Sequence, residues 1–154
     1  MVKPNELKNR VGELMEAVGL RTYQMMRYPH EFSGGQRQRI CIARALAANP
    51  DLIICDEVTS ALDQLVAEGI LKLLQKLQNE LGVSYLFITH DLATVKAIAD
   101  EIVVMLQGRI VEQGVKQDIL KPPHHNYTEL LLSSVPEMDP DWLDHLLWER
   151  RAEN

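Results

Sequence analysis

The sequence has few cysteines, few aromatic residues and no long apolar run, and each shortage excludes a class of protein. Only Cys41 and Cys55 occur among 154 residues, and neither belongs to a CxxC or Cys/His spacing. A disulfide framework and a zinc site are therefore not predicted. Both cysteines lie in apolar stretches and are expected to be buried thiols of a reducing compartment. No stretch reaches the roughly 18 apolar residues of a membrane span.

Basic charge is also scarce. The chain carries 16 Lys and Arg against 22 Asp and Glu, a net charge of −6, and its only dense basic run is Arg37, Arg39 and Arg44. An acidic chain binds nucleic-acid phosphates poorly, so no nucleic-acid partner is expected. The polar first ten residues are not a signal peptide, so we expect a single cytoplasmic domain.

Apolar patterning predicts alternating helices and strands. Helical spacing occurs over residues 5–18, 36–48, 64–81 and 92–99. Short apolar runs typical of buried strands occupy 52–55, 85–88 and 102–106, and Gln107-Gly108 suggests a hairpin turn. This order predicts an α/β fold with a parallel sheet and a small antiparallel piece near its end. After Leu120 the composition changes and a tail begins.

A serine and two glycines precede the second predicted helix, in Ser33-Gly34-Gly35-Gln36. Glycines let a backbone approach an anion, while the free N–H groups and the dipole of a helix start point at it. Ser33 adds a hydroxyl donor. An ordinary helix cap in a loop gives the same short pattern, so both interpretations are open for the motif alone.

Acidic residues and a histidine follow two of the predicted strands. Asp56 and Glu57 close the strand at 52–55, and His90 follows the strand at 85–88. Ligands of α/β sheets bind beyond the carboxyl ends of strands. There an aspartate can hold Mg²⁺, a glutamate can orient or deprotonate a water, and a histidine can hydrogen-bond a phosphate. Taken alone, the acids could simply face solvent, and either His90 or Asp91 could cap the next helix.

Five motifs follow one another in a fixed order: SGGQRQR from Ser33, ARAL from Ala43, LIICDE from Leu52, SALD from Ser60 and THD from Thr89. In this order the chain resembles the ATP-binding-cassette (ABC) ATPases, over residues 10–120. The resemblance implies part of a RecA-like, P-loop NTPase core with a parallel sheet over 51–120. It also implies part of the helical signature subdomain over 1–50 and a C-terminal extension over 121–154.

The resemblance also implies roles for single residues. The signature motif closes in trans over the γ-phosphate of ATP held by a partner subunit, and it is matched by Ser33, Gly34, Gly35 and Gln36. Asp56 matches the Walker B aspartate that serves Mg²⁺, and Glu57 matches the catalytic glutamate. Asp63 matches the D-loop, and His90 matches the switch histidine.

One motif of that family does not occur in these residues. None of the eight glycines begins the phosphate-binding loop GxxxxGK[ST], or Walker A. We therefore expect a C-terminal portion of an ABC ATPase that does not hydrolyse ATP alone. We also expect no robust monomer, because apolar strand edges would be exposed. The alternative is a non-catalytic half-domain that lends its signature motif to a partner ATPase.

The tail narrows the resemblance. Residues 123–131, followed by Ser134-Val135-Pro136, resemble the C-terminal segment of oligopeptide, dipeptide and nickel importer ATPases. The usual His-Pro-Tyr of that segment reads His125-Asn126-Tyr127 here. His124 and His125 are expected to be exposed loop residues rather than metal ligands. The sequence contains no cysteine after Cys55, so an iron–sulfur cluster in the tail is not expected. The apolar stripe of residues 142–148 is predicted to pack on the body or on a partner.

The resemblance thus implies an ATP-hydrolysing, energy-coupling subunit of an importer for oligopeptides or dipeptides, with ATP and Mg²⁺ as cofactors. Its partners would be a second ABC ATPase subunit, transmembrane permease subunits and, indirectly, a solute-binding protein. It would lie in the cytoplasm as a peripheral protein on the inner face of the membrane. An ABC protein of DNA repair or chromosome organisation would call for coiled-coil insertions and a basic surface.

Overall fold

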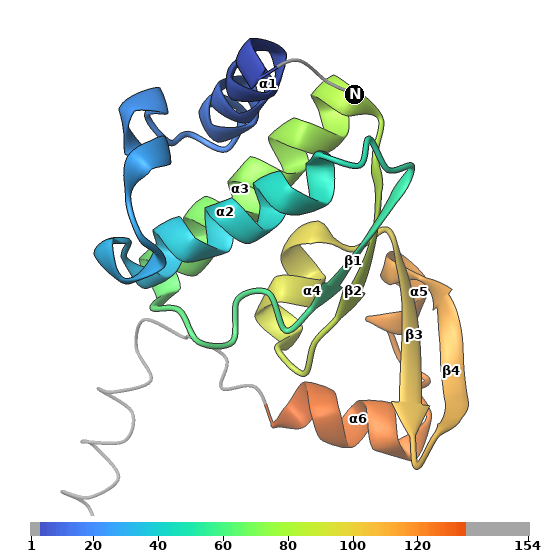
Figure 1. The fold of residues 1–154 in the computed structure, drawn as a ribbon. Coiled ribbons are helices and arrows are strands. Elements are labelled where there is room, and N and C mark those ends of the chain that lie inside the picture. The colour runs from blue at the N-terminus through green and yellow to red at the C-terminus, as the bar shows by residue number, and fades with distance from the viewer. Residues whose placement is uncertain (1–3, 135–154) are drawn as a thin grey trace, which may run out of the picture. The chain divides into compact units, whose positions relative to one another are not determined.

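A computed structural model describes residues 4–134, which fall into two compact units that meet at Ala99–Asp100. The first unit contains, in order, α1 (Pro4–Ala17), η1 (Thr22–Met26), η2 (Pro29–Glu31), α2 (Gly34–Leu46), β1 (Leu52–Asp56), α3 (Gln64–Leu81), β2 (Ser84–Ile88) and α4 (Leu92–Ile98). The second contains β3 (Glu101–Leu106), β4 (Arg109–Val115), α5 (Lys116–Ile119) and α6 (Asn126–Ser133). Figure 1 shows these elements as a ribbon.

The first unit is built on a parallel pair of strands. β1 and β2 run in register from Leu52 opposite Ser84 to Asp56 opposite Ile88, which confirms the predicted parallel sheet. Helices α2 and α3 lie side by side in Figure 1. The core contains one buried apolar cluster with Ile42 and Leu46 from α2, Ile53 and Cys55 from β1, and Ile70, Leu73, Leu74 and Leu77 from α3.

Helix α3 begins and ends where the sequence provides capping residues. Asp63 precedes α3, and its carboxylate accepts the backbone N–H of Val66. Gly82 ends α3 in the left-handed region at φ 69°, which glycine adopts without a steric cost. The helix predicted over 64–81 is confirmed with the same bounds.

The second unit is an antiparallel hairpin with two short helices. Gln107 and Gly108, between β3 and β4, have φ values of 49° and 75°, as a two-residue type I′ turn requires. The imidazole of His125 accepts the N–H of Tyr127 and so caps α6. His125 is exposed as predicted, but His124 is half-buried, which corrects that expectation. The apolar stripe predicted at 142–148 lies outside the described residues.

The two cysteines differ, which corrects the prediction that both are buried. Cys55 lies on the covered face of β1, and burial raises the pKa of its thiol to about 11. Cys41 is exposed, because it shares the outer face of α2 with Arg37 and Arg44, at i−4 and i+3. No helix within residues 4–134 is long and apolar enough to cross a membrane.

Candidate functional site

The start of α2 is held by hydrogen bonds within its own motif. Ser33 Oγ accepts the N–H of Gln36 at 3.3 Å, and Gln36 Oε1 accepts the N–H of Ser33 at 3.0 Å, forming a reciprocal capping box. In the bond from the Gln36 N–H, the Ser33 oxygen is the acceptor, so the Ser33 O–H can still donate to a ligand. The amides of Gly34 and Gly35 stand in the first turn, where no intrahelical acceptor exists. These donors form the anion-binding arrangement of a helix start.

Glu57 and His90 meet at the carboxyl end of the sheet. Because Asp56 and Ile88 are paired in the sheet, the residues that follow them emerge at the same edge. His90 Nδ1 lies 3.0 Å from Glu57 Oε1, with the two side chains 77% and 52% exposed. An exposed pair of this kind contributes little stability. In this contact Nδ1 of the His90 ring faces the Glu57 carboxylate, so Nε2 on the other side of the ring can bind a second group.

The backbone at Glu57 adopts an unfavourable conformation that its neighbours maintain. Its φ is 46°, in the left-handed region, which costs a residue with a Cβ about 1–2 kcal/mol. Its N–H donates to the carbonyl of Ile88 at 2.9 Å, and its carbonyl accepts both the N–H and the hydroxyl of Ser60. A strained backbone conformation persists where several surrounding bonds hold it in place, and such conformations are concentrated at functional sites.

Asp56 ends β1 and is exposed at the same edge. A carboxylate oxygen suits Mg²⁺, which in phosphate sites usually takes one or two carboxylates and fills its other positions with water and phosphate oxygens. Residues 4–134 contain no group of three or more histidine, cysteine or acidic side chains that could hold a metal on their own. Asp56 is one carboxylate that could supply such a ligand.

Asp91, and not His90, caps α4. Its carboxylate accepts the N–H groups of Ala93 and Thr94 and the hydroxyl of Thr94, the last at 2.6 Å. The Thr94 hydroxyl, followed by the two backbone N–H groups, lowers the pKa of Asp91 in spite of partial burial. The imidazole of His90 is consequently available to Glu57.

Asp63 caps α3, and the residues beside it contact the signature glycines. Leu62 lies against Gly34, and Val66 lies so close to Gly35 that a Cβ there would stand 2.5 Å from Val66 Cγ1. The structure therefore brings the residues beside Asp63 to the glycines of the Ser33–Gln36 segment, and separately brings Glu57 together with His90. Sequence reasoning missed the contacts of Leu62 and Val66 with these glycines, because no local pattern indicates which apolar residues near the start of α3 meet α2.

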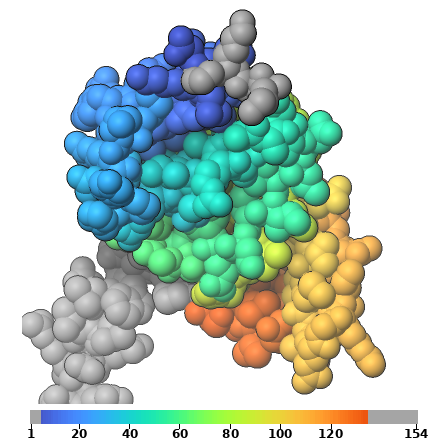
Figure 2. Space-filling model, in the orientation of Figure 1, coloured from blue at the N-terminus to red at the C-terminus, as the bar shows by residue number. Residues whose placement is uncertain are grey.

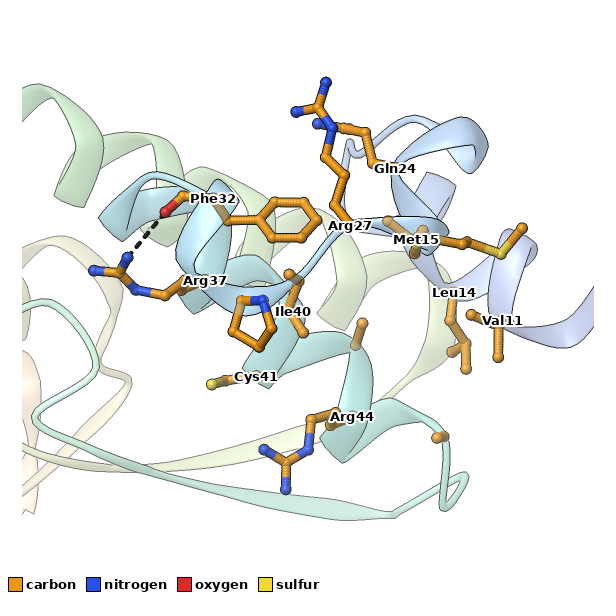
Figure 3. Close-up of a pocket in the computed structure, with 14 residues that line it drawn as sticks. Val11, Leu14, Met15, Gln24, Arg27, Phe32, Arg37, Ile40, Cys41 and Arg44 are labelled. Atoms are coloured by element: carbon orange, nitrogen blue, oxygen red, sulfur yellow. Dashed lines mark hydrogen bonds between the residues drawn. The ribbon is translucent and has the colours of Figure 1, made fainter. Parts of the chain in front are cut away.

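A cavity of about 520 Å³ opens between α1, η1 and α2 and was not predicted. In Figure 3 the Phe32 ring and Ile40 face it, and guanidinium groups stand at its margin. The apolar lining comes chiefly from Val11, Leu14, Phe32 and Ile40, and the basic margin from Arg27, Arg37 and Arg44. Arg37 donates to the carbonyl of Phe32 at 2.9 Å, and no carboxylate of the described residues, 4–134, lines the cavity. Figure 2 shows α1 and η1 (blue) against α2 (cyan) on this unit.

Two family models match the chain. Residues 1–60 match the ABC transporter model, and residues 111–154 match the model of the oligopeptide/dipeptide transporter C-terminal region. The chain therefore belongs to the ABC transporter family. Residues 111–154 are similar to the C-terminal region of oligopeptide and dipeptide transporters, the resemblance that the tail predicted.

Relatives and a solved structure agree with this placement. The dipeptide transport ATP-binding protein DppF of Escherichia coli is 55% identical over 134 residues, covering 87% of this chain and 40% of the relative. The glutathione import ATP-binding protein GsiA of Salmonella choleraesuis is 55% identical over 131 residues, covering 85% and 21%. The chain thus spans about a fifth to two fifths of these relatives.

Among solved structures, the ATP-binding cassette MJ0796, a dimer in a post-hydrolysis state bound to ADP and Pi, superposes with a TM-score of 0.64 and 33% identity. The match covers 75% of this chain and 49% of that one. The predicted fold class, an α/β ABC ATPase core with a parallel sheet, is confirmed.

Proposed function

We propose that these residues form the part of an ABC importer ATPase that senses and hydrolyses ATP, in a subunit that energises uptake of peptides. The observation that carries the proposal is the Glu57–His90 contact at the carboxyl ends of adjacent parallel strands. A carboxylate held there by an imidazole is placed to orient or deprotonate a water for attack on a γ-phosphate. Asp56 would hold Mg²⁺, which neutralises charge on the phosphates.

The signature segment serves a second ATP, held by a partner cassette. The Ser33 hydroxyl and the amides of Gly34 and Gly35 donate to its γ-phosphate, and the Gln36 side chain keeps Ser33 in place through the capping box. Asp63 keeps the adjoining D-loop turn at the start of α3. The dimer of MJ0796 with ADP and Pi is consistent with two cassettes acting together.

The cavity beside α2 would receive a segment of a permease subunit. Its apolar lining and arginine margin suit an amphipathic segment with carboxylates. The peptide-importer tail and the relatives for dipeptide and glutathione support an oligopeptide or dipeptide as cargo, with a solute-binding protein delivering it. The subunit would then lie in the cytoplasm, peripheral on the inner face of the membrane.

The test joins these residues behind an ABC segment that carries the GxxxxGK[ST] loop. This polypeptide should hydrolyse ATP, whereas the 154 residues alone should not, because no phosphate loop occurs among them. Absence of turnover from a folded joined polypeptide would refute the catalytic role, and turnover by the 154 residues alone would refute the need for the loop.

The second candidate is a non-catalytic half-domain that lends its signature motif to a partner ATPase. It is favoured by the hydrogen bonds within residues 33–36 and by the contacts of Gly34 and Gly35 with Leu62 and Val66, all of which are formed within these 154 residues. The two candidate functions predict different effects of substitutions on ATP turnover by the joined polypeptide. Loss of turnover on Glu57→Gln supports catalysis by this chain, whereas sensitivity only to Ser33→Ala supports the lending role.

A further inference from the structure

The first turns of α2 and α3 are in direct contact at a glycine. A Cβ on Gly35 would stand 2.5 Å from Val66 Cγ1, and a Cβ on Gly34 would stand 3.6 Å from Leu62 Cδ2. Only the first distance is shorter than non-bonded carbons tolerate. An alanine at position 35 would therefore require Val66 or the backbone of α2 to shift.

Val66 is also hydrogen-bonded to the turn that leads back to Glu57. Its N–H donates to Asp63 Oδ1 at 3.0 Å, the N–H of Leu62 donates to Thr59 at 3.1 Å, and the N–H of Ser60 donates to Glu57 at 3.1 Å. Residues 57–62 and 63–66 are thus two short hydrogen-bonded turns that follow each other directly along the chain. The second turn ends in the Val66 side chain, which rests on the signature glycine.

We propose that Val66 is a positioning residue that sets the signature motif relative to the D-loop turn. The inference rests on the proposed function, since it concerns how Ser33 and Gly35 reach a partner's ATP. A valine in a helix has one strongly preferred χ1 rotamer, so its Cγ1 acts as a stiff spacer. Any shift of the 57–63 turn therefore displaces the start of α2 with it.

The experiment pairs the chain with a complete ABC cassette whose own signature serine and glycine are replaced, so that turnover requires the signature of this chain. Four variants are compared: Val66→Ala, Gly35→Ala, both together, and Leu65→Ala. Leu65 is the neighbouring apolar side chain of α3 and is 81% exposed, which makes it the matched control.

Val66→Ala should lower kcat by about 3- to 30-fold, the range found for mutations along coupled networks. KM should stay within about twofold, because the partner's phosphate loop binds the ATP and the signature contact forms only in the closed state. Gly35→Ala should lower kcat further, and Val66→Ala should restore part of that loss by removing Cγ1. Leu65→Ala should match the unchanged chain.

A normal kcat for Val66→Ala, or a double variant with purely additive losses, would overturn the proposal while leaving the proposed function intact. Absence of turnover with the unchanged chain would instead refute the in-trans role of the signature motif and, with it, the positioning role, whereas the joined polypeptide tests the catalytic role separately. The melting temperatures of the four variants test the contact without ATP. Gly35→Ala should lower the melting temperature, and the double variant should melt at a higher temperature than Gly35→Ala alone. If the double variant melts no higher, the contact between positions 35 and 66 is refuted.

Discussion

The start of α2 and the carboxyl ends of β1 and β2 prepare their functional groups in opposite ways. At the helix start, the side chains of Ser33 and Gln36 bind the motif's own backbone, and backbone amides are left for a ligand. At the strand ends, the backbone of Glu57 is fully engaged, and its side chain and that of His90 lie in water. The first arrangement is set by local hydrogen bonds, whereas the second depends on the register of two strands.

The largest expected effect breaks the strand-end arrangement. In the joined polypeptide, Glu57→Gln should lower ATP turnover by about 10²- to 10⁴-fold, the usual contribution of a general base. The matched control is Glu68→Gln, since Glu68 is an exposed carboxylate on α3 that pairs with Lys72 of the next turn. Steady-state turnover distinguishes them, and equal rates for both variants would remove Glu57 from the chemistry.

A smaller loss is expected when the helix start is broken. Ser33→Ala removes the acceptor of the Gln36 N–H and should cost about 1 kcal/mol of stability, as capping residues typically do. Ser33→Thr keeps the acceptor and should cost much less. Urea unfolding of the joined polypeptide measures both. An alanine variant as stable as the threonine variant would show that the capping box contributes nothing.

The sequence predicts the helix-start arrangement more fully than the strand-end one, for a physical reason. Ser33 and Gln36 are three residues apart, so their mutual bonds follow from local geometry alone. Glu57 and His90 are 33 residues apart, and their 3.0 Å contact requires the register of β1 on β2. Sequence reasoning placed both at strand ends and left open which residue caps α4.

The contacts between elements were beyond the sequence patterns. Helical periodicity identifies α2 and α3, but it does not reveal that Val66 meets Gly35 or that Cys41 is exposed. The cavity beside α2 likewise depends on how α1 and η1 pack on that helix. The predicted domain division at residues 50 and 120, and the roles of the site residues, stay predictions.

The pH dependence of stability tests the cap of α4. Because Asp91 caps this helix, the imidazole of His90 is left to contact Glu57. The folded-state pKa of Asp91 is lowered, first by the Thr94 hydroxyl. Its contribution is therefore complete above the unfolded value, near pH 4, and is lost as pH falls through the folded pKa. Asn also caps well but does not titrate there. The stability advantage of the unchanged chain over Asp91→Asn should shrink between pH 6 and pH 3 in thermal melts, and a constant advantage would contradict the assignment.

The smallest expected effect concerns the strain at Glu57. Its φ of 46° resembles that of Gln107, at 49° in the β3–β4 turn, which provides a matched control outside the site. Relief of a left-handed conformation is worth about 1–2 kcal/mol. The added flexibility of glycine in the unfolded chain removes about 0.5–1 kcal/mol of that gain. Both Glu57→Gly and Gln107→Gly should therefore stabilise the protein by about 0.5–1 kcal/mol in urea unfolding.

Only Glu57→Gly should abolish ATP turnover in the joined polypeptide, because it also removes the carboxylate that contacts His90. A protein that becomes more stable and inactive through one substitution keeps an unfavourable backbone for the sake of its chemistry. If Glu57→Gly were no more stable than the unchanged protein while Gln107→Gly gained stability, the left-handed turn would not be strained. The conformation would then be a consequence of the bonds to Ile88 and Ser60 alone.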